Sequence, residues 1–112
     1  MRRIAANIVY INNDKEFHKN HIVELFDDMV VNHYNISEEL AMTEWLGGML
    51  LLTTASDVDL TQIDSIEEFY EAANACEQHD MRMHAYHLNK VLSPTAKFSA
   101  DNGGGNCHIK RL

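Results

Sequence analysis

The sequence lacks several features that define whole classes of protein. It has only two cysteines, Cys76 and Cys107. It has no apolar stretch approaching the roughly eighteen residues that cross a bilayer as a helix. Its start, MRRIAAN, shows no apolar segment followed by a small-residue cleavage site, so no signal peptide is expected. We therefore expect reduced thiols, a cytoplasmic location and no membrane partner.

Positive charge is missing from the middle of the chain. All nine Lys and Arg residues lie in residues 1–19 or 82–112, while residues 20–81 carry acids, and the net charge is −8. Binding of nucleic acid needs a basic face that neutralises phosphates, so no nucleic-acid partner is expected. The separation predicts that both ends lie close to the acidic middle, or that separate molecules attract one another. A solvated acidic face without a partner would also account for it.

The overall composition is typical of one globular domain. With 112 residues, of which 46% are hydrophobic and 23% charged, the chain can bury a core without disulfides. We predict an α+β, mainly β fold in a single domain covering residues 1–112. Its sheet should be mixed and rich in antiparallel pairs, with about 5–7 short strands folded on itself.

The best-defined local pattern is a β-hairpin over Ile4 to Phe26, in which two apolar runs flank a polar break at residues 12–14. Both faces of its first strand are apolar, which predicts a central strand. Simple alternation places Ile4, Ala6, Ile8 and Tyr10 on one face.

Further segments are predicted from the same alternation and from turn chemistry. Asp27 and Asp28 suit a tight turn. Residues 37–46 fit a strand or a short helix, the strand being favoured. The other predicted segments are a third meander strand at 29–36, a buried strand at 49–54, a strand at 81–91 ended by Pro94, a loop at 95–105 and a last strand at 106–111.

One principal amphipathic helix is predicted from Ser65 to His79. Ser65 followed by Glu68 is the spacing of a capping box, in which each residue satisfies a backbone N–H of the other. An apolar stripe with helical spacing follows at Ile66, Phe69, Tyr70, Ala73 and Cys76. This stripe should pack on one face of the sheet.

Three segments of residues 3–53, RIAANIVYINN, HKNHIVEL and TEWLGGMLLLT, resemble the opening of amidohydrolase-superfamily metal-dependent hydrolases. In that family these strands belong to a composite β-domain, which flanks a catalytic barrel without supplying its metal ligands. The His-x-His motif that should follow is absent, and Ala55-Ser56-Asp57-Val58 stands in its place. The remaining residues are too few for the barrel. The resemblance therefore implies a free-standing accessory β-domain with no catalytic residue transferred.

Seven histidines raise the alternative of a metal site. Cys76 and His79 are spaced i, i+3 on the predicted helix, and Cys107 lies in the last strand, so zinc could gather four such ligands. Against this, Cys76 also completes the apolar stripe, and neighbouring strand residues such as Cys107 and His108 point to opposite faces. His84 and His87 should also face opposite ways. The candidate ligands are Cys76, His79, His84, His87 and Cys107.

Other candidate motifs are incomplete. Residues 57–68 have the acidic spacing of an EF-hand loop, but Gln62 replaces the required glycine. Gly103-Gly104-Gly105 lacks the lysine of a phosphate-binding loop. We therefore predict a non-catalytic structural or protein-interaction domain, which binds another protein or itself through an exposed strand edge. The alternative is a metal- or small-ligand-binding protein.

Metal analysis of the purified protein separates these two interpretations. We expect less than stoichiometric zinc, and a melting temperature that a chelator leaves unchanged, because the ligand spacing is loose. Stoichiometric zinc that raises the melting temperature would contradict the structural interpretation.

Overall fold

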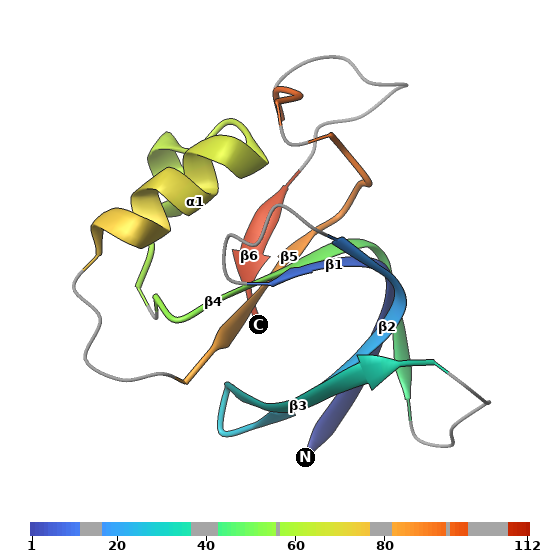
Figure 1. The fold of residues 1–112 in the computed structure, drawn as a ribbon. Helices are drawn as coiled ribbons and strands as arrows, with labels where there is room; N and C mark the ends of the chain where they lie inside the picture. Colours follow the sequence, from blue (N-terminus) through green and yellow to red (C-terminus); the bar gives the residue numbers. More distant parts are fainter. Residues whose placement is uncertain (12–16, 37–42, 56, 77–81, 94, 99–107) are drawn as a thin grey trace.

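The computed structural model describes residues 1–11, 17–36, 43–55, 57–76, 82–93, 95–98 and 108–112. Its main feature is a six-stranded sheet in the order β3-β2-β1-β4-β5-β6, with one α-helix (Figure 1). The pairs are antiparallel except for β1 with β4, which is parallel. The predicted α+β, mainly β fold with a mixed sheet is confirmed. The elements are β1 (Arg2–Ile11), β2 (Phe17–Phe26), β3 (Met29–Asn35), β4 (Glu44–Thr53), the 3-10 helix η1 (Leu60–Gln62), α1 (Ile66–Ala75), β5 (His84–Leu88) and β6 (Ile109–Arg111).

The sheet curls over on itself, as predicted. The N–H of Val30 on β3 donates to the carbonyl oxygen of Met83, just before β5, at 2.8 Å. This bridge brings one edge strand against the far half of the sheet. The inner face, which the curl encloses, buries Ile4, Ala6, Val9, Val23, Leu25, Leu50, Leu52 and Ala85. The outer face packs part of its length against α1, through Tyr10, Met49, Leu51, Tyr86 and Leu88.

A bulge between β1 and β4 changes which side chains share a face. Ala6 pairs with Leu46, but Ile8 pairs with Met49, so one residue of β1 lies opposite two glycines of β4. At this shift β1 changes faces: Ala6 lies on the inner face, whereas Ile8 packs with the outer-face core. The prediction that Ile4, Ala6, Ile8 and Tyr10 share a face was wrong. The shift involves the pairing of β1 with β4, so simple alternation within β1 could not reveal it.

Helix α1 covers the outer face through the predicted apolar stripe. Phe69 is fully buried, and its ring centroid lies 4.9 Å from that of Tyr86 on β5. Ser65 Oγ accepts from the Glu68 N–H at 3.1 Å, which confirms this half of the capping box. The Glu68 carboxylate instead accepts from the Asp64 N–H, one residue earlier than predicted. The helix ends at Ala75, earlier than the predicted His79, because its C-cap residue Cys76 has extended backbone angles (φ −74°, ψ 144°); residues 77–79 lie outside the described part.

The strand boundaries differ from the predictions in two places. β4 begins at Glu44 and continues through both glycines, which settles residues 44–46 as strand; residues 37–42 lie outside the described part. β5 covers His84–Leu88, whereas the predicted strand covered residues 81–91. The reason is again the bulge: Leu88 pairs with Met49, the first residue of β4 after Gly48, and the ladder stops there. The Asp27-Asp28 turn is confirmed, with positive φ at both residues.

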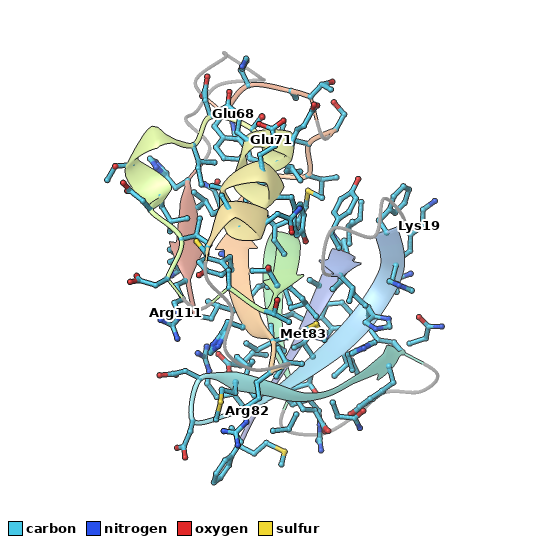
Figure 2. The ribbon with its side chains drawn as sticks, turned by 60° about the vertical axis from the view of Figure 1, so that its left-hand side comes forward. Lys19, Glu68, Glu71, Arg82, Met83 and Arg111 are labelled. Atoms are coloured by element: carbon cyan, nitrogen blue, oxygen red, sulfur yellow. The ribbon has the colours of Figure 1, made fainter. Side chains whose placement is uncertain are left out.

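Ion pairs join the basic ends of the chain to its acidic middle. Arg2 Nε lies 3.1 Å from a carboxylate oxygen of Glu44, and Lys97 Nζ lies 3.2 Å from one of Glu68. These contacts confirm the first alternative drawn from the charge pattern. Figure 2 shows Glu68 on α1 far from Arg82, which lies beside β3. No helix of the described residues is long and apolar enough to span a membrane.

The bulge generates a matched pair of glycine substitutions. Gly48 has φ +88°, and an added Cβ would lie 2.0 Å from the carbonyl oxygen of Leu88, whereas a Cβ at Gly47 would meet nothing within 4 Å. We expect Gly48→Ala to lower the free energy of unfolding by about 3 kcal/mol or more, because strain and a backbone clash combine. Gly47→Ala should change it by about 1 kcal/mol or less. Urea denaturation measures both, and equal effects would contradict the bulge geometry.

Candidate functional site

The outer face of the sheet has a part that does not belong to the core under α1. There, one row of paired residues crosses four strands: Tyr34 on β3, Ile22 on β2, Ala5 on β1 and Trp45 on β4. Next to this row, Arg3 pairs with Glu24, and Phe26 lies two residues further along β2. We call this surface the Trp45 face. It consists of Arg3, Ile22, Glu24, Phe26, Tyr34 and Trp45.

Large aromatic side chains stand exposed on the Trp45 face. Trp45 is 62% exposed and Phe26 is 53% exposed, whereas Ile22 on the same face is buried. Alternation along β4 explains the position of Trp45: its neighbour Leu46 packs with the inner core, so Trp45 must point outward. The single tryptophan of the chain is therefore on the surface.

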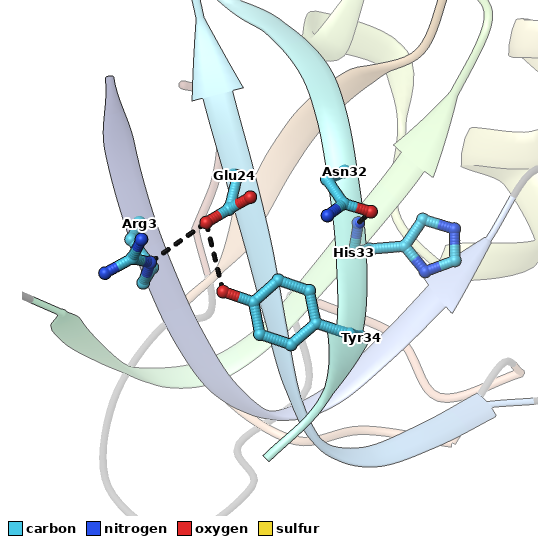
Figure 3. A network of polar contacts seen from close by, with 5 residues as sticks. All are labelled: Arg3, Glu24, Asn32, His33 and Tyr34. Atoms are coloured by element: carbon cyan, nitrogen blue, oxygen red, sulfur yellow. Dashed lines mark hydrogen bonds and ion pairs between the residues drawn. The ribbon is translucent and has the colours of Figure 1, made fainter. Parts of the chain in front are cut away.

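A hydrogen-bonded network fixes the polar side of the Trp45 face (Figure 3). One carboxylate oxygen of Glu24 accepts from Arg3 Nε and from the Tyr34 hydroxyl, both at 3.0 Å. The Glu24 side chain is only 12% exposed. The bond from Arg3, followed by that from Tyr34, holds the pKa of Glu24 below its usual value despite the opposing effect of burial. The network links β1, β2 and β3 and orients the tyrosine ring over the face.

The edge of β3 is closed at two of its outward-facing backbone groups. The N–H of Val30 donates to Met83, and the N–H of His33 donates to the side-chain oxygen of its neighbour Asn32 at 3.0 Å (Figure 3). An edge strand recruits another strand through such N–H groups when they are unpaired. The face of the sheet is therefore better suited to a partner than the edge at β3.

The inner face carries a cluster of histidines from two strands. His21 Nε2 lies 3.0 Å from His33 Nδ1, and His21 Nδ1 lies 2.8 Å from the side-chain oxygen of Asn35. The rings of His18 and His21 have centroids 4.9 Å apart. His21 is only 4% exposed. Burial lowers the pKa of His21, and charge on His18 or His33 would lower it further, while the hydrogen bond that His21 makes to the Asn35 side-chain oxygen raises it.

The histidine cluster was not predicted, because simple alternation places His18 and His21 on opposite faces of β2. Between them Asn20 has φ +50°, and it interrupts the pairing of β1 with β2. Residues on either side of it therefore share the inner face. Asparagine tolerates positive φ better than most residues, and this is the one signal in the sequence that could have indicated the irregularity.

The described members of the predicted metal set are not brought together. Cys76 Sγ lies 3.3 Å from the carbonyl oxygen of Ala72 at the end of α1. His84 and His87 lie on opposite faces of β5, as predicted, since Ala85 packs in the inner core and Tyr86 in the outer one. Within the described residues no three His, Cys, Asp or Glu side chains are arranged to hold a metal. His79 and Cys107 lie outside that part, so the zinc site stays a prediction.

Both β5 histidines have other partners. His84 Nδ1 lies 3.3 Å from the carbonyl oxygen of Asp28 and 3.3 Å from Arg111 Nη2. His87 Nε2 lies 2.7 Å from the carbonyl oxygen of Gly47, in the bulge. These contacts tie β5 to the Asp27-Asp28 turn and to β4, which is a structural use of both side chains.

The acids that resemble an EF-hand loop form local caps. Asp59 Oδ1 accepts from the N–H and the hydroxyl of Thr61, at 3.0 and 2.6 Å, and so begins η1. Glu68 is bonded to Asp64 and Lys97. These two carboxylates stabilise turns instead of converging on a common point.

No protein-family model matches this chain, and neither the curated proteins nor the solved structures contain a match. The candidate sites are therefore judged on their geometry alone.

The Glu24 network gives a prediction with an internal control. We expect Arg3→Gln to raise the pKa of Glu24, because the guanidinium bond is the largest cause of its lowering. Arg2→Gln, one residue away on β1, should leave it unchanged, because Arg2 pairs with Glu44. A carbon-detected NMR titration of the side-chain carboxyl groups measures both. A Glu24 pKa that is equal in wild type and Arg3→Gln would contradict the network.

Proposed function

We propose that this chain is a non-catalytic protein-interaction domain that binds a partner protein through the Trp45 face. The observation that carries the proposal is the exposure of Trp45 and Phe26 on a sheet face outside the core under α1. Single exposed apolar residues are normal on a protein surface. Here two large aromatic side chains share a face with Tyr34 and Arg3, the residue types that dominate binding energy at protein interfaces.

The backbone and side chains of this face are well suited to binding without large rearrangement. Four strands support the row from Tyr34 to Trp45, and the Glu24 network fixes Tyr34. A preformed, rigid surface loses little conformational entropy on association. The exposed ring of Trp45 would supply the apolar anchor, and the Arg3 and Glu24 groups would form part of a polar rim.

The charge of the chain favours a different protein over a second copy. Each molecule has a net charge of −8, so two copies repel one another at long range. Asp27 and Asp28 are exposed at the turn after Phe26, which adds negative charge near one end of the Trp45 face. A partner with a basic rim around an apolar pocket would be complementary to this surface.

The resemblance to the composite β-domain of amidohydrolase-superfamily hydrolases supports the same role. In those enzymes the domain is an accessory to a catalytic barrel. A free-standing relative of it would be expected to act by contact with another chain.

The test compares Trp45→Ala with Val91→Ala, which removes an exposed apolar side chain after β5 and outside the Trp45 face. Proteins that wild type captures from a native lysate are identified, and the leading one is purified and titrated by calorimetry. We expect Trp45→Ala to weaken its Kd by about 30-fold, the size of an interface hot spot, and Val91→Ala to leave it unchanged.

Three results would contradict the proposal. The first is a purified partner that binds wild type and Trp45→Ala equally. The second is no specific capture by either protein. The third is a wild-type dimer, seen by light scattering after gel filtration, that Trp45→Ala dissociates, because the occupant of the face would then be a second copy. Thermal melting checks that both variants fold, which is expected because both side chains are largely exposed.

A further inference from the structure

The histidine cluster on the inner face joins an edge strand to the rest of the sheet. His18 and His21 come from β2, and His33 comes from β3, which has the outermost position in the strand order. The ring centroids of His21 and His33 are 5.2 Å apart. Beyond the Val30 bridge at its start, β3 is held through β2, so contacts between these two strands decide whether its second half stays in the sheet.

The bonds of His21 define the protonation state of the cluster. The Asn35 side-chain oxygen can only accept, so His21 Nδ1 carries a hydrogen and donates to it. In the neutral ring His21 Nε2 is then an acceptor, and His33 Nδ1 must donate to it across 3.0 Å. Both links from His21 to β3 therefore exist together when His21 and His33 are neutral.

Only the second proton taken up by the pair removes this arrangement. A proton on His21 Nε2 can still be accommodated if His33 moves its own hydrogen to Nε2 and accepts at Nδ1. When both rings are protonated, the N–H groups of His21 Nε2 and His33 Nδ1 face one another across the 3.0 Å that the hydrogen bond spanned, so neither can accept. Double protonation also brings two positive charges together, with His18 as a third group that can be charged nearby.

The surroundings offer no compensating negative charge among the described groups that face His21. On β1, His21 pairs with Ala6, which pairs in turn with Leu46 of β4, and neither side chain is charged. The other titratable groups on the inner face are separated from His21 by other strands or rows. His87 lies in the row of His18 with two strands between them, and Glu44 is bonded to Arg2.

We propose that His18, His21 and His33 form a proton-operated clasp that keeps the second half of β3 paired with β2 at neutral pH and releases it on mild acidification. The ligand of this site is the proton itself. Release means that the β3 amides that bond β2 open to solvent while β1 and β4 stay paired. This inference does not depend on the proposed function.

The direction of the pH effect follows from the burial of His21, which lowers its pKa in the folded state. The unfolded or released state, with an ordinary pKa of about 6.5, binds the proton more readily. The stabilising contribution is therefore complete above about pH 6.5 and is lost as the pH falls toward the lowered value. The paired state is favoured at neutral pH and the released state in acid.

Amide hydrogen exchange at pH 7.5 and pH 5.0, corrected for intrinsic rates, tests the clasp. The Ile36 N–H donates to the Asn20 carbonyl oxygen at 2.9 Å, and Tyr34 bonds β2 in the same ladder. We expect the protection of these two amides to fall by about tenfold or more in acid, and that of Val9 and Leu50 to stay constant. In His21→Gln the dependence on pH should disappear. In His108→Gln, an exposed histidine beside β6, it should stay as in wild type.

Two outcomes would overturn the clasp: protection at Tyr34 and Ile36 that is independent of pH in wild type, and a loss in acid that is as large in His21→Gln as in wild type. If His21→Gln does not fold, His33→Gln serves instead, because His33 is partly exposed and can be replaced with less disturbance of the core. The nitrogen chemical shifts of the His21 ring at the two pH values report the protonation directly.

Discussion

The parallel pairing of β1 with β4 is the contact on which the rest of the structure depends. It joins the meander of β3, β2 and β1 to the second half of the sheet, and it contains the bulge at Gly47 and Gly48. The bulge brings the Gly48 backbone so close to Leu88 that only glycine fits. At the same point β1 changes the face to which its alternate side chains point, from Ala6 on the inner face to Ile8 on the outer face, whereas β4 keeps its regular alternation. The outer face therefore presents Trp45 before the bulge, and Tyr10 and Met49 to α1 after it.

The outer face therefore has two parts, one that is buried under α1 and one that is exposed around Trp45. Where α1 packs, aromatic rings such as Phe69 and Tyr86 are buried against one another. Before the bulge Trp45 stays exposed on the same sheet face as the Glu24 carboxylate, which is held by Arg3 and Tyr34. The proposed protein-binding role rests on these two features, an exposed tryptophan and a fixed polar network on one face. The charge separation along the sequence serves the fold here, because the basic first residues neutralise acids of the middle.

The strand β3 connects the two candidate sites. His33 points to the inner face and bonds His21, while Tyr34 points to the outer face and bonds Glu24. Neighbouring residues of one strand thus hold it to β2 from both sides. If acid opens the inner contacts, Tyr34 loses the backbone that positions it on the Trp45 face. The two sites would then respond to pH together, although each is defined by its own contacts.

The sequence by itself determined the elements whose signals are local. The hairpin, the Asp27-Asp28 turn, the meander and the start of the helix at Ser65 depend on alternation, turn chemistry and capping within a few residues. Only the tertiary structure decided which side chains share a face of the sheet. The bulge at Gly48 moves Ile8 away from Ala6, and the positive φ of Asn20 brings His18 beside His21. Gly48 lies against Leu88 of β5, and the Asn20 carbonyl oxygen accepts from Ile36 at the end of β3, so each irregularity involves another strand. A pattern read along one strand therefore could not place Trp45 in the same row as Tyr34, or His21 against His33.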